Sequence, residues 1–235
     1  MPALASRPTR SPPGLRAIEE LIDGTPGDEK HDPAARSTLD VLWVLYDRVL
    51  RYDPADPRWD GRDRFLLSKG HGPITLYAIL AAKGFFPSEW LTGFLAWDGR
   101  LGGHPDRNLV PGVEISTGSL GHGVPMAVGV ALALRAKRSD RRVFVLLGDG
   151  EANEGSVWEA FLLAGNLGLD NLTAILIDNH TSSRDLGDLP AKLGAFGWTA
   201  FQARSSDHDA LESALRHREV GRPTALVVDW REVAR

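Results

Sequence analysis

One stretch of the chain, residues 143–179, strongly restricts the folds that it can adopt. It begins with five consecutive apolar residues, 143–147, and ends with a second apolar run, 173–177, and a helix-like segment, 156–169, lies between them. Short apolar runs of this kind are typical of strands that are buried on both faces. A strand, a helix and a second strand form a β-α-β unit, whose two strands lie parallel with a right-handed crossover. The stretch therefore predicts a parallel sheet.

Oxygen-bearing side chains follow both of these expected strands. Asp149 lies between two glycines, Gly148 and Gly150, directly after the first strand, and Asn179 follows the second. The carboxyl ends of parallel strands meet at one edge of the sheet, where ligands of open α/β sheets bind. Carboxylate and amide oxygens suit Mg²⁺, which also binds phosphate oxygens, and glycines let such a ligand approach the backbone. Gly-Asp-Gly alone also fits an ordinary turn, but the second donor after the crossover favours a Mg²⁺-diphosphate site.

The rest of the chain continues the alternation of helices and strands. Further helices are expected over residues 15–22, 38–50 (capped by Ser37 or Thr38), 74–83, 86–97, 123–137, 191–196 and 208–217. Further strands are expected over residues 64–67, 112–115, 198–201 and 224–228. Residues 28–36 are polar and are predicted to be irregular. The alternation indicates an α/β fold with a mostly parallel sheet and helices on both faces. We expect residues 1–14 to be a mobile tail and residues 15–235 to form a single domain.

Composition excludes several classes of function. The net charge is −4, so no basic field attracts nucleic acid or an anionic membrane, and neither is expected as a partner. The longest strongly apolar run, 124–134, is too short to cross a bilayer. The chain has no cysteine, which removes disulfides, zinc thiolates and a cysteine nucleophile and fits a reducing cytoplasm. We therefore expect a cytoplasmic protein with small-molecule chemistry.

Three of the seven histidines lie in loops that suit a ligand-binding site. His71 lies between two glycines directly after an expected strand, His104 lies in a glycine- and proline-containing loop, and His31 precedes the helix at 38–50. A histidine in a loop is most often an ordinary exposed residue, but flanking glycines let a ligand approach His71. The other four are interpreted as ordinary polar residues, and His208 and His217 are placed on a solvated helix face.

At this point the motifs of the chain resemble those of transketolases. The sequences SKGHG at 68–72, GHPD at 103–106 and STGSLGHG at 116–123 are similar to signatures of that family. GDG at 148–150, followed thirty residues later by Asn179, resembles the thiamine diphosphate motif. The resemblance extends over about residues 31–230 and is confined to the N-terminal, diphosphate-binding half of a transketolase, as found in split, two-subunit enzymes.

The resemblance implies which residues hold thiamine diphosphate and Mg²⁺. The metal would bind the side chains of Asp149 and Asn179 and the main-chain carbonyl of Thr181. Other contacts with the cofactor would come from His71, Gly118, Leu120, Gly148, Gly150 and Glu154.

The same resemblance assigns catalytic roles to His31, His71, His104 and Glu154. His31 and His104 match residues that orient the hydroxyls of the sugar donor, and His71 would assist proton transfer. Glu154 and Glu159 match acidic residues at a subunit interface that link two active sites, although a solvated helix face is the other interpretation of this pair.

Two departures from the family pattern are visible. The residues around His31 read KHDPA in place of a glycine-rich HPGG motif, so the approach of the backbone to a ligand differs there. After Asn179 the sequence HTSSRDLGD is more polar than the apolar stretch that the family places under the thiazolium ring. We expect the packing of that ring to differ accordingly.

The resemblance implies a subunit that acts only with a partner. No part of the chain is similar to the pyrimidine-binding half of a transketolase, so we expect an α2β2 assembly with a C-terminal partner subunit. The implied reaction transfers a two-carbon ketol unit from a ketose-like donor to an aldehyde-like acceptor, with sugars or sugar phosphates as substrates. Two alternatives remain at this stage: the α subunit of a 2-oxo acid dehydrogenase, and a non-catalytic subunit that stabilises a partner.

Overall fold

A five-stranded parallel sheet forms the centre of the computed structural model, which describes residues 14–27 and 33–231 of the chain. The strands are β1 (Arg64–Leu67), β2 (Val143–Gly148), β3 (Leu172–Asp178), β4 (Thr199–Arg204) and β5 (Thr224–Asp229), in the order β1-β2-β3-β5-β4. All four pairings are parallel. The predicted α/β fold with a parallel sheet is confirmed, and the carboxyl ends of all five strands point to one edge.

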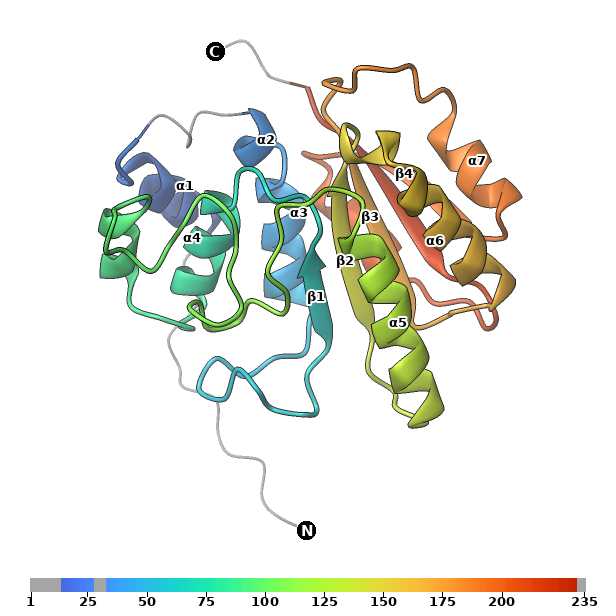
Figure 1. Cartoon of the computed structure of the whole chain (residues 1–235), viewed down its shortest axis with the longest axis horizontal. Coiled ribbons are helices and arrows are strands. Elements are labelled where there is room, and N and C mark those ends of the chain that lie inside the picture. The colour runs from blue at the N-terminus through green and yellow to red at the C-terminus, as the bar shows by residue number, and fades with distance from the viewer. Residues whose placement is uncertain (1–13, 28–32, 232–235) are drawn as a thin grey trace.

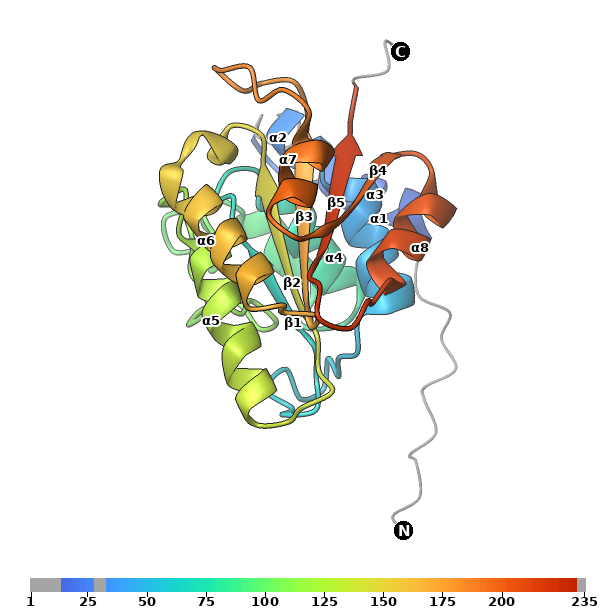
Figure 2. The same ribbon diagram turned by 90° about the vertical axis from the view of Figure 1, so that its right-hand side faces the viewer.

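Helices cover both faces of this sheet, as Figures 1 and 2 show. One face is covered by α1 (Leu15–Asp23), α3 (Leu39–Val44), α4 (Ile74–Ala82) and α8 (His208–Arg216). The other face is covered by α5 (Gly123–Ala136), α6 (Gly155–Asn166) and α7 (Leu189–Ala195). The helices expected from the sequence in these regions lie within a few residues of the observed ones, apart from the segments described below.

Alternate residues of each strand supply the two hydrophobic cores. In β2, Phe144 and Leu146 pack with α3, α4 and α8, whereas Val143, Val145 and Leu147 pack with α5 and α6. All five side chains are fully buried, because a strand between two helix layers has no solvent-facing side. This burial confirms the prediction made from the apolar run, and it makes β2 a rigid support for the residues that follow it.

Several local predictions differ from the structure. Residues 33–36 were expected to be irregular but form a short helix, α2 (Pro33–Arg36), and the expected helix at 38–50 changes after α3 into a π-helix, Leu45–Val49. The Thr38 hydroxyl donates back to the carbonyl of Ala35 over 2.8 Å, so neither it nor Ser37 caps α3. The segment expected to be helical at 86–97 contains only a 3₁₀-helix, Ser88–Gly93.

The strand expected at 112–115 is wrong, because this segment has no strand partner. Gly112 has a positive φ of 87°, and Glu114 forms a bidentate ion pair with Arg62 over 2.7 and 2.9 Å. These features fix an irregular loop over the edge of the sheet instead of another strand. Within the described residues, no helix is long and apolar enough to cross a membrane.

Candidate functional site

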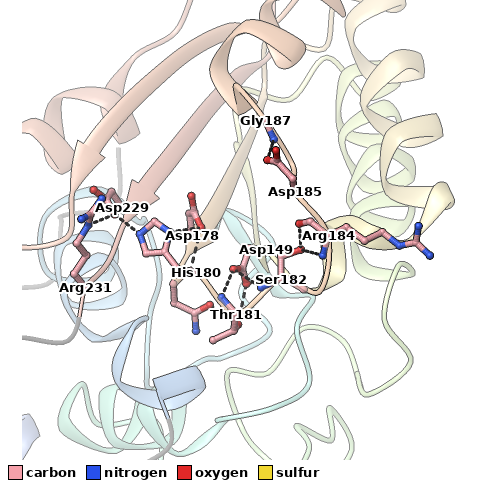
Figure 3. A network of polar contacts seen from close by, with 12 residues as sticks. Asp149, Asp178, His180, Thr181, Ser182, Arg184, Asp185, Gly187, Asp229 and Arg231 are labelled. Carbon is pink, nitrogen blue, oxygen red and sulfur yellow. Dashed lines mark hydrogen bonds and ion pairs between the residues drawn. The ribbon is translucent and has the colours of Figure 1, made fainter.

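The carboxyl ends of β2 and β3 bring together the three residues that the sequence assigns to a metal. Asp149 follows β2 and is 2% exposed, and its carboxylate faces the turn that follows β3. Its Oδ2 accepts hydrogen bonds from the backbone N–H groups of Thr181, over 2.7 Å, and Ser182, over 3.0 Å. Figure 3 shows this carboxylate enclosed by the turn. The crossover thus places Asp149 beside Asn179 and Thr181, as expected.

Three oxygen atoms converge at this point. The hydroxyl oxygen of Thr181 lies 2.7 Å from Oδ1 of Asn179 and 3.2 Å from Oδ1 of Asp149. A hydroxyl has one hydrogen to donate, so it satisfies only one of these two acceptors at a time. Asp149 Oδ1 also accepts from the Gly150 N–H over 2.7 Å. The carboxylate of Asp149 and the amide oxygen of Asn179 are hard oxygen donors of the kind that suits Mg²⁺.

The glycine turn that carries Asp149, residues 148–150, has open space beside its backbone. A Cβ atom added to Gly150 would meet nothing within 4 Å, and one added to Gly148 would meet only Lys69, at 3.8 Å. Gly150 therefore leaves its backbone open to the approach of a ligand beside Asp149. The residues present fit a Mg²⁺-diphosphate.

The three other predicted motifs meet one another near this edge. A Cβ atom added to Gly70 would lie 2.6 Å from Cα of Gly118 and 2.5 Å from Cδ2 of His104. The rings of His71 and His104 lie 5.4 Å apart, centroid to centroid, and both side chains are exposed. The loops 68–72, 103–106 and 116–123 are thus in contact only because glycine occupies positions 70 and 118. His31 lies outside the described residues.

The two predicted acidic residues lie at the start and on the exposed face of α6. Glu154 is the residue that precedes α6, and its Cβ lies 2.8 Å from the position that a Cβ on Gly121 would take. Glu154 therefore contacts the 116–123 loop, which carries the half-buried Leu120. Glu159 is exposed one turn further along the helix.

His180 was missed as a site residue. It lies between Asn179 and Thr181 with a positive φ of 59°, and its Nε2 lies 2.8 Å from a carboxylate oxygen of Asp229 at the end of β5. Its Nδ1 lies 3.5 Å from Asp178. Figure 3 shows the ring between these two carboxylates. The signal in the sequence was that Asp178 and Asp229 both end apolar strands, which places them side by side.

The predictions for two further histidines are wrong. His208 and His217 were placed on a solvated helix face, but Nε2 of His208 lies 2.7 Å from Asp40 of α3. The ring of His217 packs edge-on against Phe201, with 4.9 Å between centroids. Both fasten α8 to its neighbours.

A buried glutamate, Glu151, was also missed. It lies two residues after Asp149 and is 2% exposed, and a buried carboxylate is costly unless it is paired. Burial raises the pKa of Glu151, and hydrogen bonds from the Ser68 hydroxyl and the Gly121 N–H only partly offset that effect. The signal in the sequence was a second acidic residue within three positions of the end of a strand that is buried on both faces.

Fold and edge together define an α/β protein of the class that binds its ligands at the carboxyl edge of a parallel sheet. The family model of the transketolase, thiamine diphosphate binding domain, matches residues 16–231. The chain therefore belongs to this family, as the motifs predict, and thiamine diphosphate is its cofactor.

Individual relatives agree with this family. An apulose-4-phosphate transketolase subunit of Actinobacillus succinogenes is 41% identical over 210 residues, which cover 85% of this chain and 75% of that protein. A protein of Rhodococcoides fascians named ferredoxin fas2 is 47% identical over 212 residues, covering 89% of this chain and 70% of that protein. The present chain has no cysteine to bind an iron–sulfur cluster. Among solved structures, the transketolase from Leishmania mexicana matches with a TM-score of 0.80 and 30% identity, over 92% of this chain and 36% of that chain. The chain is thus of the transketolase type, a transferase, and corresponds to its N-terminal subunit.

Proposed function

We propose that this subunit holds thiamine diphosphate through Mg²⁺ and, with a C-terminal partner subunit, transfers a two-carbon ketol unit from a ketose to an aldehyde. The observation that supports this proposal most strongly is that the side chains of Asp149 and Asn179 meet at the Thr181 hydroxyl, next to the open side of Gly150. The side chains of Asp149 and Asn179 and the carbonyl of Thr181 bind the metal. Gly148, Gly150 and His71 adjoin the diphosphate, and Gly118, Leu120 and Glu154 adjoin the aminopyrimidine.

The cofactor supplies the carbanion and the electron sink that cleavage of a carbon–carbon bond beside a carbonyl requires. The chain itself binds, orients and moves protons. His71 and His104 are exposed and adjacent, so both can reach a substrate that enters from solvent. His104, with His31, orients the hydroxyls of the donor, and His71 assists proton transfer at the reacting centre.

A partner subunit is supported by the apolar surface of α5 and α6. Met126, Leu162, Leu163 and Leu167 are between 37% and 49% exposed on these two helices or directly after them. We call these four residues the α5–α6 apolar surface. Apolar side chains grouped on adjacent helices are typical of protein interfaces, and the exposed Glu154 and Glu159 lie on the same helix layer. The proposed assembly is α2β2.

The names of the relatives suggest the class of substrate. Two of them are called an apulose-4-phosphate transketolase subunit and 6-deoxy-6-sulfo-D-fructose transketolase subunit SqwG, the latter 38% identical over 208 residues. We propose a sugar or sugar phosphate as donor for the present chain. The absence of cysteine favours the cytoplasm as its place of action.

The decisive experiment is to purify the chain together with its C-terminal partner, and to measure ketol transfer with and without thiamine diphosphate and Mg²⁺. We expect transfer only when both subunits, the cofactor and the metal are present. Decarboxylation of pyruvate in place of ketol transfer would favour a 2-oxo acid dehydrogenase, and binding to the partner without either reaction would favour a stabilising subunit. Activity of the isolated chain would overturn the need for a partner.

A further inference from the structure

One buried carboxylate near the proposed cofactor site has no role in the proposed function. Glu151 begins a 3₁₀-helix, Glu151–Asn153, directly after the glycine turn that carries Asp149. Its Oε1 accepts two hydrogen bonds, from the Ser68 hydroxyl over 2.5 Å and from the Gly121 N–H over 2.9 Å. Its Oε2 is also buried and has no hydrogen-bond partner within the described part of the chain.

The two donors belong to segments that are far apart in the sequence. Ser68 follows β1, and its N–H donates to the carbonyl of Leu146 in β2 over 2.8 Å. Gly121 lies at the end of the loop that leads into α5, 53 residues after Ser68. The carboxylate of Glu151 therefore joins three segments at the carboxyl edge of the sheet.

Gly121 is held on both sides of its backbone. Glu151 accepts from its N–H, and the hydroxyl of Ser156 donates to its carbonyl over 2.7 Å. Gly121 has a positive φ of 82°, and a Cβ at this position would lie 2.5 Å from Oγ of Ser156 and 2.8 Å from Cβ of Glu154. A Cβ on Gly123 would collide with Ser68. The loop thus has little room to move away from Glu151 and the start of α6.

These contacts have a geometric consequence for the site. Gly118 and Leu120 immediately precede Gly121, and His71 comes three residues after Ser68. Because one oxygen atom of Glu151 binds both Ser68 and Gly121, the carboxylate bridges the 116–123 loop and the 68–72 loop.

The burial of this group argues for a positioning role. A buried oxygen without a partner costs free energy, and an apolar side chain of the same size would fill the space without that cost. The 3₁₀-helix, α6 and the sheet are held by other contacts, since Trp158 donates to Ala152 over 2.7 Å and β2 is buried on both faces. In the two loops, by contrast, Glu151 is the acceptor for the Ser68 hydroxyl and the Gly121 N–H.

We propose that Glu151 is a positioning residue for thiamine diphosphate, which fastens the 116–123 loop and the 68–72 loop at the spacing that the bound cofactor requires. Glu151 acts through Ser68 and Gly121 and touches no cofactor atom itself. The proposal rests on the proposed function, because it needs thiamine diphosphate to bind at this edge.

The test compares Glu151→Gln with Glu151→Leu in the chain assembled with its partner. Gln keeps the oxygen that accepts from Ser68 and Gly121, whereas Leu has similar size and removes both hydrogen bonds. Calorimetry in Mg²⁺ gives the Kd of thiamine diphosphate for each variant. We expect Glu151→Leu to raise this Kd about tenfold and Glu151→Gln to leave it within about threefold of the unchanged protein. Glu89→Leu, at an exposed position of the 3₁₀-helix Ser88–Gly93, is the control and should leave the Kd unchanged.

The outcomes separate this proposal from the proposed function. If the unchanged protein fails to bind thiamine diphosphate, or if Asp149→Ala binds it equally well, the proposed function is wrong. If Asp149→Ala weakens binding but Glu151→Leu lowers only the thermal stability and leaves the Kd unchanged, Glu151 is merely structural and this proposal is wrong. Should Glu151→Leu fail to fold, Ser68→Ala removes one of the two hydrogen bonds, and an unchanged Kd in that variant would equally overturn the proposal.

Discussion

The backbone N–H of Thr181 donates to the carboxylate of Asp149 over 2.7 Å, which joins the turn after β3 to the end of β2. The hydroxyl of the same threonine lies 3.2 Å from the other carboxylate oxygen. The turn after β3 is therefore held in place by the residue that is proposed to bind the metal. Because the turn is already ordered, little of the free energy of ligand binding is spent on ordering it.

Replacement of Asp149 by Ala should abolish tight cofactor binding. The change removes the one anionic ligand of the proposed metal site and also the acceptor for Thr181 and Ser182. We expect the Kd of thiamine diphosphate in Mg²⁺ to rise at least about a hundredfold, as measured by calorimetry. Asp185→Ala is the matched control, because that carboxylate lies on the same loop and accepts from the N–H of Gly187. Equal effects of the two changes would contradict the metal assignment.

Position 180 should accept glycine with a smaller loss of stability than alanine. Its φ of 59° lies in the left-handed region, which glycine adopts freely and alanine does not. Both changes remove the ring contacts with Asp178 and Asp229 and keep the backbone N–H bond to Asp178, so their difference isolates backbone strain. We expect the free energy of unfolding of His180→Ala to lie about 1 kcal/mol below that of His180→Gly, as measured by urea denaturation. Equal stability would show that the turn relaxes out of this conformation.

The buried carboxyl of Glu151 should make stability depend on pH. Burial raises its pKa above the ordinary value of 4.5, so the folded state binds more protons than the unfolded state between those two pKa values. Glu151 therefore makes its full contribution to the free energy of unfolding below pH 4.5, where the carboxyl is protonated in both states. This contribution falls as the pH rises and is lost once the pH passes the folded pKa.

Glu151→Gln removes this titration. We therefore expect its free energy of unfolding, relative to the unchanged protein, to increase as the pH rises from 4.5 through the folded pKa. Denaturant titrations at several pH values measure the difference. A difference that stays constant over this range would show that the carboxyl titrates alike in both states.

Gly165 in α6 should not accept a side chain. A helix interior normally gains up to about 1 kcal/mol of stability from Gly→Ala, but a Cβ on Gly165 would collide with the carbonyl of Phe196. We expect Gly165→Ala to lower the free energy of unfolding by about 1–3 kcal/mol. Gly194→Ala in α7, where a Cβ would meet nothing within 4 Å, should be neutral or stabilising. Thermal unfolding of both variants would test the contrast.

The α5–α6 apolar surface should be required for assembly. Leu163 is 49% exposed, so Leu163→Arg should leave the fold intact while placing an unpaired charge in a buried interface. We expect the Kd of the two subunits to rise at least about tenfold, as measured by analytical ultracentrifugation. Val220→Arg introduces the same charge at a 91% exposed residue outside these two helices and is the control. Unaffected assembly of Leu163→Arg would place the partner elsewhere.

The sheet and its carboxyl edge could be predicted because apolar runs fix strands by burial alone. Val143–Leu147 had no alternative to a central strand, and the position of Asp149 and Asn179 then followed from the crossover. The cap at Thr38 was wrong because its hydroxyl donates to the carbonyl of Ala35 in α2, a helix in a segment that was expected to be irregular. The pairs His180–Asp229 and Glu151–Gly121 were missed because each joins residues separated by 30 or more positions, and no local pattern marks such pairs.

The order of the strands also affects how the chain reaches its folded state. β5 comes last in the sequence but lies between β3 and β4, which pair with it and not with each other. During synthesis, β4 can therefore join the sheet only after residues 224–229 have been made and have paired with β3. Contacts between distant segments slow folding, and until then the exposed edge of β3 is open to wrong pairing. Asp229, which ends β5 and binds His180, comes to lie beside Asp178 only when β5 pairs with β3.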